Sequence, residues 1–561
     1  MTKHFFLDQH GCAKNQVDGE LIIGILTGLG WSKTHEPEHA DLIIVNSCGF
    51  IEPAKRESIE AVVTARTAYP KAKILLAGCL AERYGEVFQT DFEEADAFFG
   101  NGDLSQLPLL MEKLFPELNS TSGCENTASE SHGTVKRPFI KPAQEGISCG
   151  ARPELLNFPR SAFIKITEGC NNCCTFCAIP LIRGPVRSRP VASIVDEIRE
   201  FVQKGYKEFN LIGQDLAVYD AAPPLRTSLL RSETANTGRV SMPKPSAAIE
   251  DSPLPLNLEA LSKAKLHIRQ PKLSGLAQLL QAISDIPGKF SVRLLYIHPD
   301  HFPLDILPIM TADTRFLPYF DIPFQSGSAS IIRAMNRCGS PETYLEMVET
   351  IRAAFRNAKS PYGEAVIRTT FLTGFPGETQ DDFEQTAAFL RAVQSLWSGA
   401  FVYSREEGTK AARMKKRVPT QTAEQRKTAL NELQLHITEE KLAAFCGKEL
   451  MVLIEEVIPQ AAEAAVPVPG STQAEERTAS DAQGTPFSTI DKYDESRIAL
   501  GRAWFQAPEV DGAIVVNFSE SQRDTEGRFI QPGSLVRVQI TALRGICLLY
   551  TSPSPRDRQK S

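Results

Sequence analysis

A cluster of cysteines constrains this chain more than any other feature of its sequence. Cysteines occupy four of the eight positions from 170 to 177, directly after the strand-like run Ala162–Thr167. Thiolates this close together on one loop can converge on a single soft-metal centre. Cys170, Cys174 and Cys177 have the spacing C-x3-C-x2-C, which supplies three ligands to a [4Fe–4S] cluster and leaves one iron open to a small molecule. The sequence therefore predicts a catalytic iron–sulfur site, with Cys173 as a bystander.

Two other uses of clustered cysteines fit the sequence less well. A disulfide requires an oxidising compartment, whereas no secretory signal is present and the adjacent Cys173 and Cys174 suit a reducing one. A structural zinc site usually takes two C-x2-C pairs, and only one thiol cluster is local here. No apolar run reaches the ~18–20 residues needed to span a membrane. We therefore expect a cytoplasmic protein that uses its 12 cysteines for metal binding or catalysis.

The cysteine spacing, followed by alternating strand and helix patterns, resembles the radical S-adenosylmethionine (SAM) superfamily. The resemblance implies that the amino and carboxylate groups of SAM chelate the open iron of the cluster. It also implies that the reduced cluster cleaves SAM to a 5′-deoxyadenosyl radical, which removes hydrogen from an unactivated carbon.

A second pattern recurs three times in the first domain, which we place at residues 1–117: an apolar strand, a cysteine at its end and an amphipathic helix. Cys12, Cys48 and Cys79 hold the same position in the three units, each next to a glycine. Continuous apolar strands alternating with helices indicate a buried parallel sheet, and ligands bind such sheets at the carboxyl ends of their strands. A single cysteine there would usually be a small core residue. Three equivalent cysteines predict a second three-thiolate [4Fe–4S] site.

Two three-cysteine sites in this order resemble the methylthiotransferase family of radical SAM enzymes. Four motifs resemble the branch of that family that modifies ribosomal protein S12: Gly11–Asp18, Val45–Ile51, Ala54–Ile59 and Gly78–Tyr84. The branch that modifies tRNA adenosine carries Met-Asn where this chain has Lys14-Asn15, and a Ser-Val-Arg type of sequence where it has Gly49–Ile51. Ser326 is a departure, because the S12 branch usually has His at that position.

The central domain, which we place at residues 159–415, alternates six strand-like runs with helices and predicts an open, partial (β/α)6 barrel. The runs are Ala162–Thr167, Glu208–Gly213, Val292–Ile297, Tyr319–Pro323, Val366–Thr373 and Ala400–Ser404. Active residues of such barrels lie at the carboxyl ends of the strands. The candidates there, apart from the cysteines, include Gln214, Asp215, Tyr296, His298 and Gln325–Gly327.

The loop after the fifth strand has the sequence Gly-Phe-Pro-Gly-Glu, at residues 374–378. Its two glycines and its proline expose backbone donors and acceptors. The family resemblance implies that Gly374, Pro376, Gly377 and Glu378 lie beside SAM. Without the cysteine cluster, such a loop would be an ordinary connection from a strand to a helix.

Three further groups of polar residues are candidates for this site. Gln214 and Asp215 could bind the ribose or the amino group of SAM, although an aspartate after a strand more often caps a helix. Arg368 lies inside the fifth strand, where a charge must be paired or face the barrel lumen, so it could contact a carboxylate. The three arginines of the segment Ile179–Pro190 could hold an acidic substrate or cap the barrel rim.

Three polar segments interrupt this organisation. Residues 118–158 are predicted to form a linker, in which Cys124 and Cys149 are unassigned, solvent-facing thiols. Residues 221–272 and 459–491 are predicted to be insertions, the first into the barrel and the second into the last domain. Both are rich in polar residues and lack apolar periodicity.

The last domain, at residues 448–546, follows a bridging helix predicted at 416–447. Its strand-like runs predict a small antiparallel β-barrel: Glu449–Val457, Ile498–Phe505, Gly512–Phe518 and Ser534–Thr541. The segment Gly501–Gly512 resembles the TRAM domain, which in this family docks the substrate. Residues 547–561 resemble a translated sequencing adapter, so we expect this segment, including Cys547, to carry no function.

These resemblances imply an α/β enzyme that adds a methylthio group to the β-carbon of an aspartate in ribosomal protein S12. One SAM would methylate sulfur held at the Cys12, Cys48 and Cys79 site. A second SAM would be cleaved at the other three-cysteine site. The implied cofactors are two [4Fe–4S] clusters and SAM. The implied partners are S12, a sulfur donor and a reductant such as flavodoxin or ferredoxin, without a membrane.

Two alternatives stay open at this point. A tRNA adenosine methylthiotransferase would use the same two clusters; the net charge of −7 and Gly49–Ile51 argue against it, whereas Ser326 argues for it. A non-catalytic iron–sulfur scaffold or ribosome-assembly factor would not turn SAM over. The intact Gly-Phe-Pro-Gly-Glu loop and the two complete cysteine triads argue against that second alternative.

Overall fold

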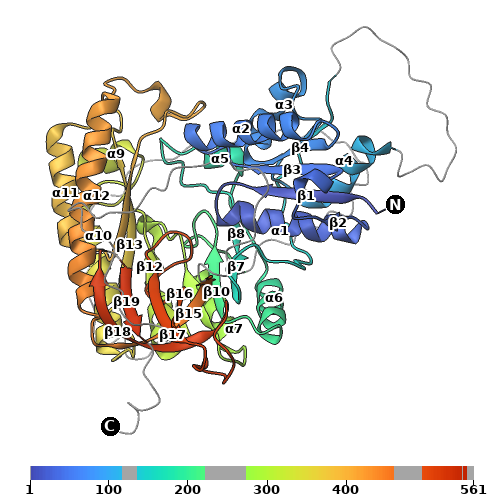
Figure 1. Ribbon diagram of the computed structural model, residues 1–561. Helices are drawn as coiled ribbons and strands as arrows, with labels where there is room; N and C mark the ends of the chain where they lie inside the picture. Colours follow the sequence, from blue (N-terminus) through green and yellow to red (C-terminus); the bar gives the residue numbers. More distant parts are fainter. Residues whose placement is uncertain (1, 117–135, 222–272, 460–495, 546, 552–561) are drawn as a thin grey trace, which may run out of the picture.

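The computed structural model describes residues 2–116, 136–221, 273–459, 496–545 and 547–551. Cys124, nearly all of both predicted insertions and the last ten residues therefore lie outside the described chain. Figure 1 shows three parts: an N-terminal α/β layer, a central sheet flanked by helices, and a β-barrel that packs against the central sheet. None of the helices in the described residues is long and apolar enough to cross a membrane.

The N-terminal part is a parallel sheet with strand order β2-β1-β3-β4-β5-β6. The strands are β1 (His4–Gln9), β2 (Ser32–Lys33), β3 (Leu42–Ser47), β4 (Lys73–Gly78), β5 (Ala97–Phe99) and β6 (Phe139–Ile140). The helices are α1 (Ala13–Gly28), α2 (Glu52–Ala68), α3 (Cys79–Asp91) and α4 (Leu107–Leu114). Alternate residues of β3 and β4 enter two separate apolar cores, one on each face of the sheet. The predicted buried parallel sheet is confirmed.

Within the segment predicted as a linker, residues 136–158 pack against the domains on either side. Strand β6 adds to the edge of the N-terminal sheet beside β5. Arg152 is buried between Glu20 of α1 and Glu197 of the central part, and it forms ion pairs with both. Cys149 is exposed, as expected of a solvent-facing thiol. This stretch therefore joins the first two parts through specific contacts.

The central part is a second parallel sheet of six strands, in the order β14-β13-β12-β11-β10-β7. Its strands are β7 (Ser161–Lys165), β10 (Glu208–Ile212), β11 (Ser291–Leu294), β12 (Phe316–Asp321), β13 (Val366–Thr373) and β14 (Trp397–Val402). Its helices are α5 (Ile179–Ile182), α6 (Val191–Gln203), α7 (Gly275–Ser284), α8 (Leu307–Ala312), α9 (Ala329–Ala334), α10 (Pro341–Asn357) and α11 (Gln380–Val393). The edge strands β7 and β14 do not pair, so the predicted open, six-stranded barrel is confirmed.

Strands β7 and β11 end two and three residues before the apolar runs predict. β7 stops at Lys165, and Thr167–Glu168 instead forms a short antiparallel ribbon (β8) with Arg187–Ser188 (β9). β11 stops at Leu294, and Tyr296 takes a left-handed backbone conformation with φ of 70°. Both changes redirect the chain at the carboxyl edge of the sheet, where side chains have to turn toward a site.

The last part begins with the long helix α12 (Thr420–Ala443), which packs on β14 and α11. A closed barrel follows with strand order β15-β16-β17-β19-β18. The strands are β15 (Glu449–Ile458), β16 (Ser496–Arg502), β17 (Ile514–Ser519), β18 (Leu535–Arg544) and β19 (Cys547–Thr551). All pairs are antiparallel except β17–β19, which is parallel. The predicted C-terminal barrel is thus present, and residues 547–551 supply one of its strands.

The loop from β16 to β17 joins this barrel to the central sheet. β16 ends at Arg502, and beyond it Phe505 stacks on the ring of Phe445 while Trp504 meets that ring edge to face. The backbone oxygen of Phe505 accepts a hydrogen bond of 2.6 Å from the indole of Trp397, at the start of β14. These contacts fix the C-terminal barrel against the open edge of the central one.

Candidate iron–sulfur and substrate site

The first cysteine triad lies at one edge of the N-terminal sheet. Cys12 precedes α1 after β1, Cys48 directly follows β3, and Cys79 begins α3 after β4. β1, β3 and β4 are consecutive neighbours in the sheet, and neighbouring strands lie roughly 4.8 Å apart. The three thiols therefore stand in a row at the carboxyl ends of adjacent strands, where the sequence predicts them.

Asn15 holds two of these thiols. Its Oδ1 accepts hydrogen bonds from Cys12 Sγ at 3.6 Å and from Cys79 Sγ at 3.5 Å. Asn101 Nδ2 also donates to Cys79 Sγ, at 3.4 Å. Gly78 has φ of 90°, and a Cβ there would come within 2.6 Å of Asn46 Oδ1. Only glycine therefore fits at this position.

Burial and nearby charges give the three thiols different pKa values. Burial raises the pKa of Cys48 to about 12 and also raises that of Cys79. Burial acts the same way on Cys12, but the charges of Lys14 and Arg183 outweigh it, and its pKa lies below the ordinary value. The negative charges of Cys79 and Cys12 also raise the pKa of Cys48.

The second triad lies on the loop after β8. Cys177 N–H donates to the backbone oxygen of Cys174 at 3.0 Å, and Cys170 N–H donates to Gly184 at 3.1 Å. Burial raises the pKa of Cys170 to about 11 and that of Cys177 to about 12. Cys173 is exposed, with φ of 51°, which agrees with the role of a bystander.

The donor sets of both sites suit a cuboidal iron–sulfur cluster. Each supplies three soft thiolate ligands, and Cys173, the fourth cysteine of the second loop, is exposed to solvent. In the described part of the chain, no three His, Cys, Asp or Glu side chains are grouped to bind a single metal ion. A four-iron cluster does not need such a group, because each cysteine binds a different iron. The residues therefore fit the predicted clusters, and their assignment as ligands stays a prediction.

Arg183, just after α5, connects the two triads. Its Nη2 donates to Cys79 Sγ at 3.3 Å and to Asn15 Oδ1 at 2.9 Å. Its Nη1 donates to Glu168 Oε1 at 2.6 Å, and Glu168 lies two residues before Cys170 in the sequence. The residue is 2% exposed. One guanidinium therefore touches the first triad and the strand end that carries the second.

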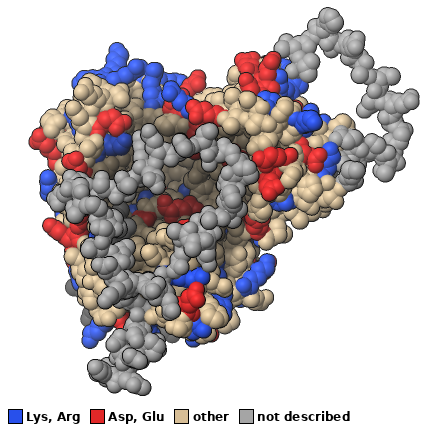
Figure 2. Space-filling model, in the orientation of Figure 1, with Lys and Arg blue, Asp and Glu red and all other residues tan. Residues whose placement is uncertain are grey.

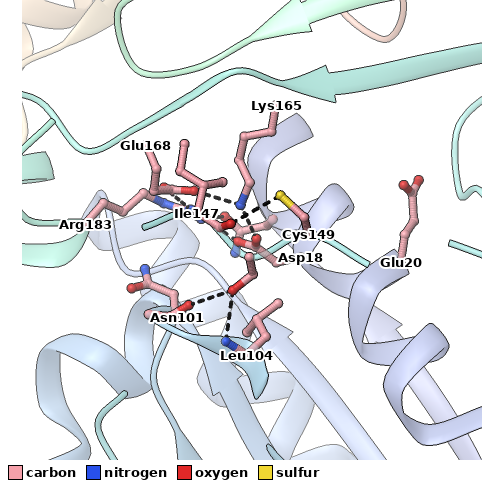
Figure 3. A network of polar contacts seen from close by, with 12 residues as sticks. Asp18, Glu20, Asn101, Leu104, Ile147, Cys149, Lys165, Glu168 and Arg183 are labelled. Carbon is pink, nitrogen blue, oxygen red and sulfur yellow. Dashed lines mark hydrogen bonds and ion pairs between the residues drawn. The ribbon is translucent and has the colours of Figure 1, made fainter. Parts of the chain in front are cut away.

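A buried network of charges surrounds Arg183. Figure 3 shows Lys165 and Arg183 directed toward Asp18 of α1 and Glu168 of β8. Burial raises the pKa of Glu168, but the charges of Arg183 and Lys165 have the larger opposite effect. The pKa of Glu168 therefore lies well below its ordinary value. This network is not evident from the sequence motifs. Its signal was Lys165, a charge inside the apolar strand β7 that needs a buried partner.

The residues predicted to contact SAM through side chains after β10 have local partners. Asp215 Oδ1 accepts from the backbone of Ala217 and His298, and its Oδ2 accepts from Asn172 Nδ2 at 2.8 Å. Gln214 Nε2 donates to Glu168 Oε1 at 3.1 Å, while its own buried Oε1 has no hydrogen-bond partner among the residues that the structure describes. Asp215 thus holds the cysteine loop, and Gln214 has one acceptor left for a ligand.

The Gly-Phe-Pro-Gly-Glu loop packs beside the cysteine loop. Phe375 and Phe176, the residue before Cys177, belong to one small apolar cluster. Gly374 and Pro376 line a cavity of about 220 Å³, at the ends of β13 and β14. Gly377 N–H donates to Lys416 at 2.9 Å. The two predicted halves of a SAM site are therefore neighbours, and the SAM contacts themselves stay predictions.

Glu378 is engaged within its own loop. Its carboxylate accepts a hydrogen bond from Gly374 N–H and lies 3.5 Å from Arg426 of α12. Burial raises the pKa of this carboxyl above its ordinary value, although Arg426 acts in the opposite direction. Glu378 therefore fixes the shape of the loop and ties it to α12.

Three parts of the chain meet in front of the first triad. Lys14 of α1 lies over the ring of Tyr296, with its Nζ 3.4 Å from the ring centroid. Arg368 in β13 pairs with Asp321 of β12 at 3.2 Å and with Asp511 of the β16–β17 loop at 3.3 Å. The prediction that Arg368 contacts a carboxylate is confirmed. The face drawn in Figure 2 is hollowed near its centre, and acidic side chains lie on the wall of the hollow.

Two groups singled out in the sequence have structural partners. Ser326 is 3% exposed, lies 3.2 Å from Thr386 Oγ1, and accepts a hydrogen bond from Ser328 N–H. Arg189 pairs with Glu197 of α6, whereas Arg187 donates to backbone oxygens, including that of Gly146. Neither Ser326 nor these two arginines touches the cysteines, so they support the loops around the site.

Three family models match successive parts of the chain. The model described as "Uncharacterized protein family UPF0004" matches residues 4–100, the radical SAM superfamily model matches 164–390, and the TRAM domain model matches 488–549. Among solved structures, the radical SAM methyltransferase TsrM from Kitasatospora setae covers 73% of this chain and 77% of its own, at 13% identity and a TM-score of 0.46. That score is too low to identify a shared fold.

Curated relatives resemble the chain over nearly its whole length. A protein of Treponema denticola named "Ribosomal protein uS12 methylthiotransferase RimO" is 51% identical, over 97% of this chain and 99% of the relative. Proteins of the same name from Aquifex aeolicus and Thermotoga maritima are 32% and 30% identical, over 95% and 90% of this chain and 93% and 92% of their own lengths. The chain therefore belongs to the RimO family of radical SAM methylthiotransferases.

Proposed function

We propose that this chain transfers a methylthio group to the β-carbon of an aspartate in ribosomal protein S12. The observation that carries the proposal is the pairing of two three-thiol sites across one buried arginine. Arg183 contacts Cys79 of the first triad and Glu168 beside the second. A radical enzyme with a single cluster has no need of the first triad. The relatives named as uS12 methylthiotransferases supply the substrate of the proposal.

The two sites have distinct tasks in this proposal. When bound, two [4Fe–4S] clusters and SAM supply the methyl group and the radical chemistry that a weakly acidic carbon–hydrogen bond requires. Cys12, Cys48 and Cys79 hold one cluster, and Cys170, Cys174 and Cys177 hold the other. Hydrogen bonds to a ligating sulfur tune the potential of a cluster.

The surrounding side chains orient the ligands and exclude water. Asn101 and Arg183 donate to Cys79, and Asn15 Oδ1 lies 3.6 Å from Cys12 Sγ and 3.5 Å from Cys79 Sγ. Asn172 and Asp215 fix the loop of the second triad. The Gly374–Glu378 loop and Gln214 are the proposed contacts for SAM.

The proposed partners follow from this chemistry. They are S12, a sulfur donor that replaces each sulfur consumed, and a low-potential reductant such as flavodoxin or ferredoxin. The proposal places the enzyme in the cytoplasm, where S12 and reduced thiols are both found.

No described contact favours tRNA as the substrate. Ser326 was the one residue that argued for it, and its hydroxyl is engaged with Thr386 and Ser328 in the interior. Its role in holding α9 against α11 accounts for a serine at this position without reference to the substrate.

The test is an anaerobic competition between substrates. Reconstituted enzyme, SAM, sulfide and reductant are given purified S12 and total tRNA together, and mass spectrometry measures a methylthio group on each. The proposal predicts modification of one aspartate of S12, lost in Cys48→Ala. Methylthioadenosine in tRNA with unmodified S12 would move the assignment to tRNA, and intact SAM would argue for a non-catalytic protein.

A further inference from the structure

Lys14 is a buried cation without an anionic partner. The residue is 8% exposed, and its Nζ faces the ring of Tyr296, 3.4 Å from the centroid. Among the described residues, no carboxylate forms a hydrogen bond or an ion pair with Lys14 within 4.0 Å. Burying an ammonium group is costly unless a partner compensates for the lost hydration. The ring face offsets only part of that cost.

Three other cations of this region are each paired with two carboxylates. Lys165 contacts Asp18 and Glu168, and Arg183 contacts the same two carboxylates. Arg368 contacts Asp321 and Asp511. The carboxylates nearest to Lys14 are thus already engaged by other cations. Among the described residues, the Cys12 sulfur is the group whose negative charge acts most strongly on Lys14, and a carboxylate partner has to come from another molecule.

The position of Lys14 indicates which anion that is. It lies two residues after Cys12, and its partner Tyr296 stands at the carboxyl edge of the central sheet, where the charges of Asp321 and Glu509 also act on it. Charges from the first two parts of the chain therefore act on the ammonium group, and a charge from the third part acts on its partner Tyr296. A side chain that is to be modified between the two triads has to reach this junction.

We propose that Lys14 binds the carboxylate of the aspartate side chain that receives the methylthio group. This assignment rests on the proposed function. It identifies the group that the site recognises as a short side-chain carboxylate. Lys14 and the face of Tyr296 form the subsite: the ammonium group donates to the carboxylate, and the ring keeps the lysine chain in place. An amide or an uncharged base gains no ionic contact there.

A second role for Lys14 makes a different prediction. As a counter-charge for the Cys12 sulfur alone, it would alter the first cluster and would act equally on every substrate. The two roles separate when the charge is removed from the enzyme and from the substrate in turn. Such a double-mutant cycle isolates the contact between the two groups.

The experiment measures the affinity of anaerobic holoenzyme for S12 and for S12 with the modified aspartate changed to asparagine. Wild-type enzyme and the Lys14→Met, Lys14→Arg and Lys71→Met variants are compared. Lys71 is an exposed lysine on the turn before β4 and serves as the matched control. Iron content and the electron paramagnetic resonance signal of the first cluster are recorded for each variant.

We expect wild-type and Lys71→Met enzyme to bind the aspartate form about tenfold more tightly than the asparagine form. Lys14→Met should bind both forms with the weaker affinity, and Lys14→Arg should keep most of the preference. An unchanged preference in Lys14→Met overturns the subsite. An equal loss for both forms, together with an altered cluster signal, assigns the counter-charge role and also overturns it. If wild-type enzyme binds neither form, the proposed function itself fails.

Discussion

Arg183 donates a hydrogen bond to the sulfur of Cys79 at 3.3 Å, although the two residues belong to different domains. The same guanidinium contacts Glu168 and Asp18. The first triad therefore does not stand alone in the N-terminal sheet, because part of its immediate environment comes from the central barrel. This arrangement couples the position of one thiol site to the loop that carries the other.

Removal of Arg183 should destabilise the junction of the two domains. Arg183→Met leaves Asp18 with Lys165 alone and Glu168 with one cation fewer, and breaking a buried ion pair costs about 3–5 kcal/mol. Arg187→Met is the control, because Arg187 donates to backbone oxygens near the surface, and we expect a loss of about 1 kcal/mol. Urea unfolding followed by tryptophan fluorescence measures both. Equal losses in the two variants would contradict the role given to Arg183.

Single cysteine variants should separate the two clusters. Cys48→Ala and Cys174→Ala are each expected to lose about half of the iron bound by the reconstituted chain. Only Cys48→Ala should retain cleavage of SAM. Cys173→Ala is the matched control from the same loop, and it should keep all of the iron because the residue is exposed. Iron analysis checks this prediction, and full iron content in Cys48→Ala would remove the first site from the account.

Gly78 should be intolerant of any side chain. With φ of 90° and Asn46 Oδ1 at 2.6 Å from the position of a Cβ, Gly78→Ala is strained and displaces the start of α3, where Cys79 lies. We expect a loss of about 1–3 kcal/mol in stability and less iron at the first site. Gly28→Ala, at the open end of α1, has nothing within 4 Å and should be neutral or stabilising. A tolerated Gly78→Ala would show that the close approach is dispensable.

The pH dependence of stability should report on the contact between the C-terminal barrel and the central sheet. Burial raises the pKa of Glu208, but the charges of Arg502 and Arg293 have the larger opposite effect. The pKa of Glu208 therefore lies well below its ordinary value. A depressed pKa in the folded state stabilises the protein above the unfolded value of about 4.3, and this contribution is lost as the pH falls below it.

Glu208→Gln removes that contribution, so it should be less stable than wild type at neutral pH. The difference should shrink as the pH falls below about 5. Unfolding free energies of both proteins at several pH values measure it. A difference that stays constant down to acid pH would contradict the linkage to Glu208.

The fold was predictable where local sequence determines structure. Continuous apolar runs such as those of β3 and β4 can be buried only inside a parallel sheet covered on both faces, and the structure has two cores there. The ends of strands were less predictable, as Tyr296 and Thr167 show. There the chain turns to satisfy contacts with distant segments, which a run of apolar residues does not encode.

Candidate ligands were predictable for the same local reason, since each cysteine follows a strand end. The network around Arg183 was not, because Asp18, Lys165 and Glu168 come from separate segments and only the folded chain brings them together. That Arg368 pairs with a carboxylate was predictable, since a buried charge needs a counter-charge. Its second partner, Asp511, lies on a loop of another domain.

The measurement that tests the account most directly follows hydrogen from the substrate. S12 labelled with deuterium at the β-carbon of aspartate is incubated anaerobically with the holoenzyme, SAM, sulfide and reductant. We expect one deuterium to appear in the released 5′-deoxyadenosine and the same aspartate to gain a methylthio group. 5′-Deoxyadenosine without deuterium, alongside unmodified S12, would contradict the claim that this aspartate carbon is the site of reaction.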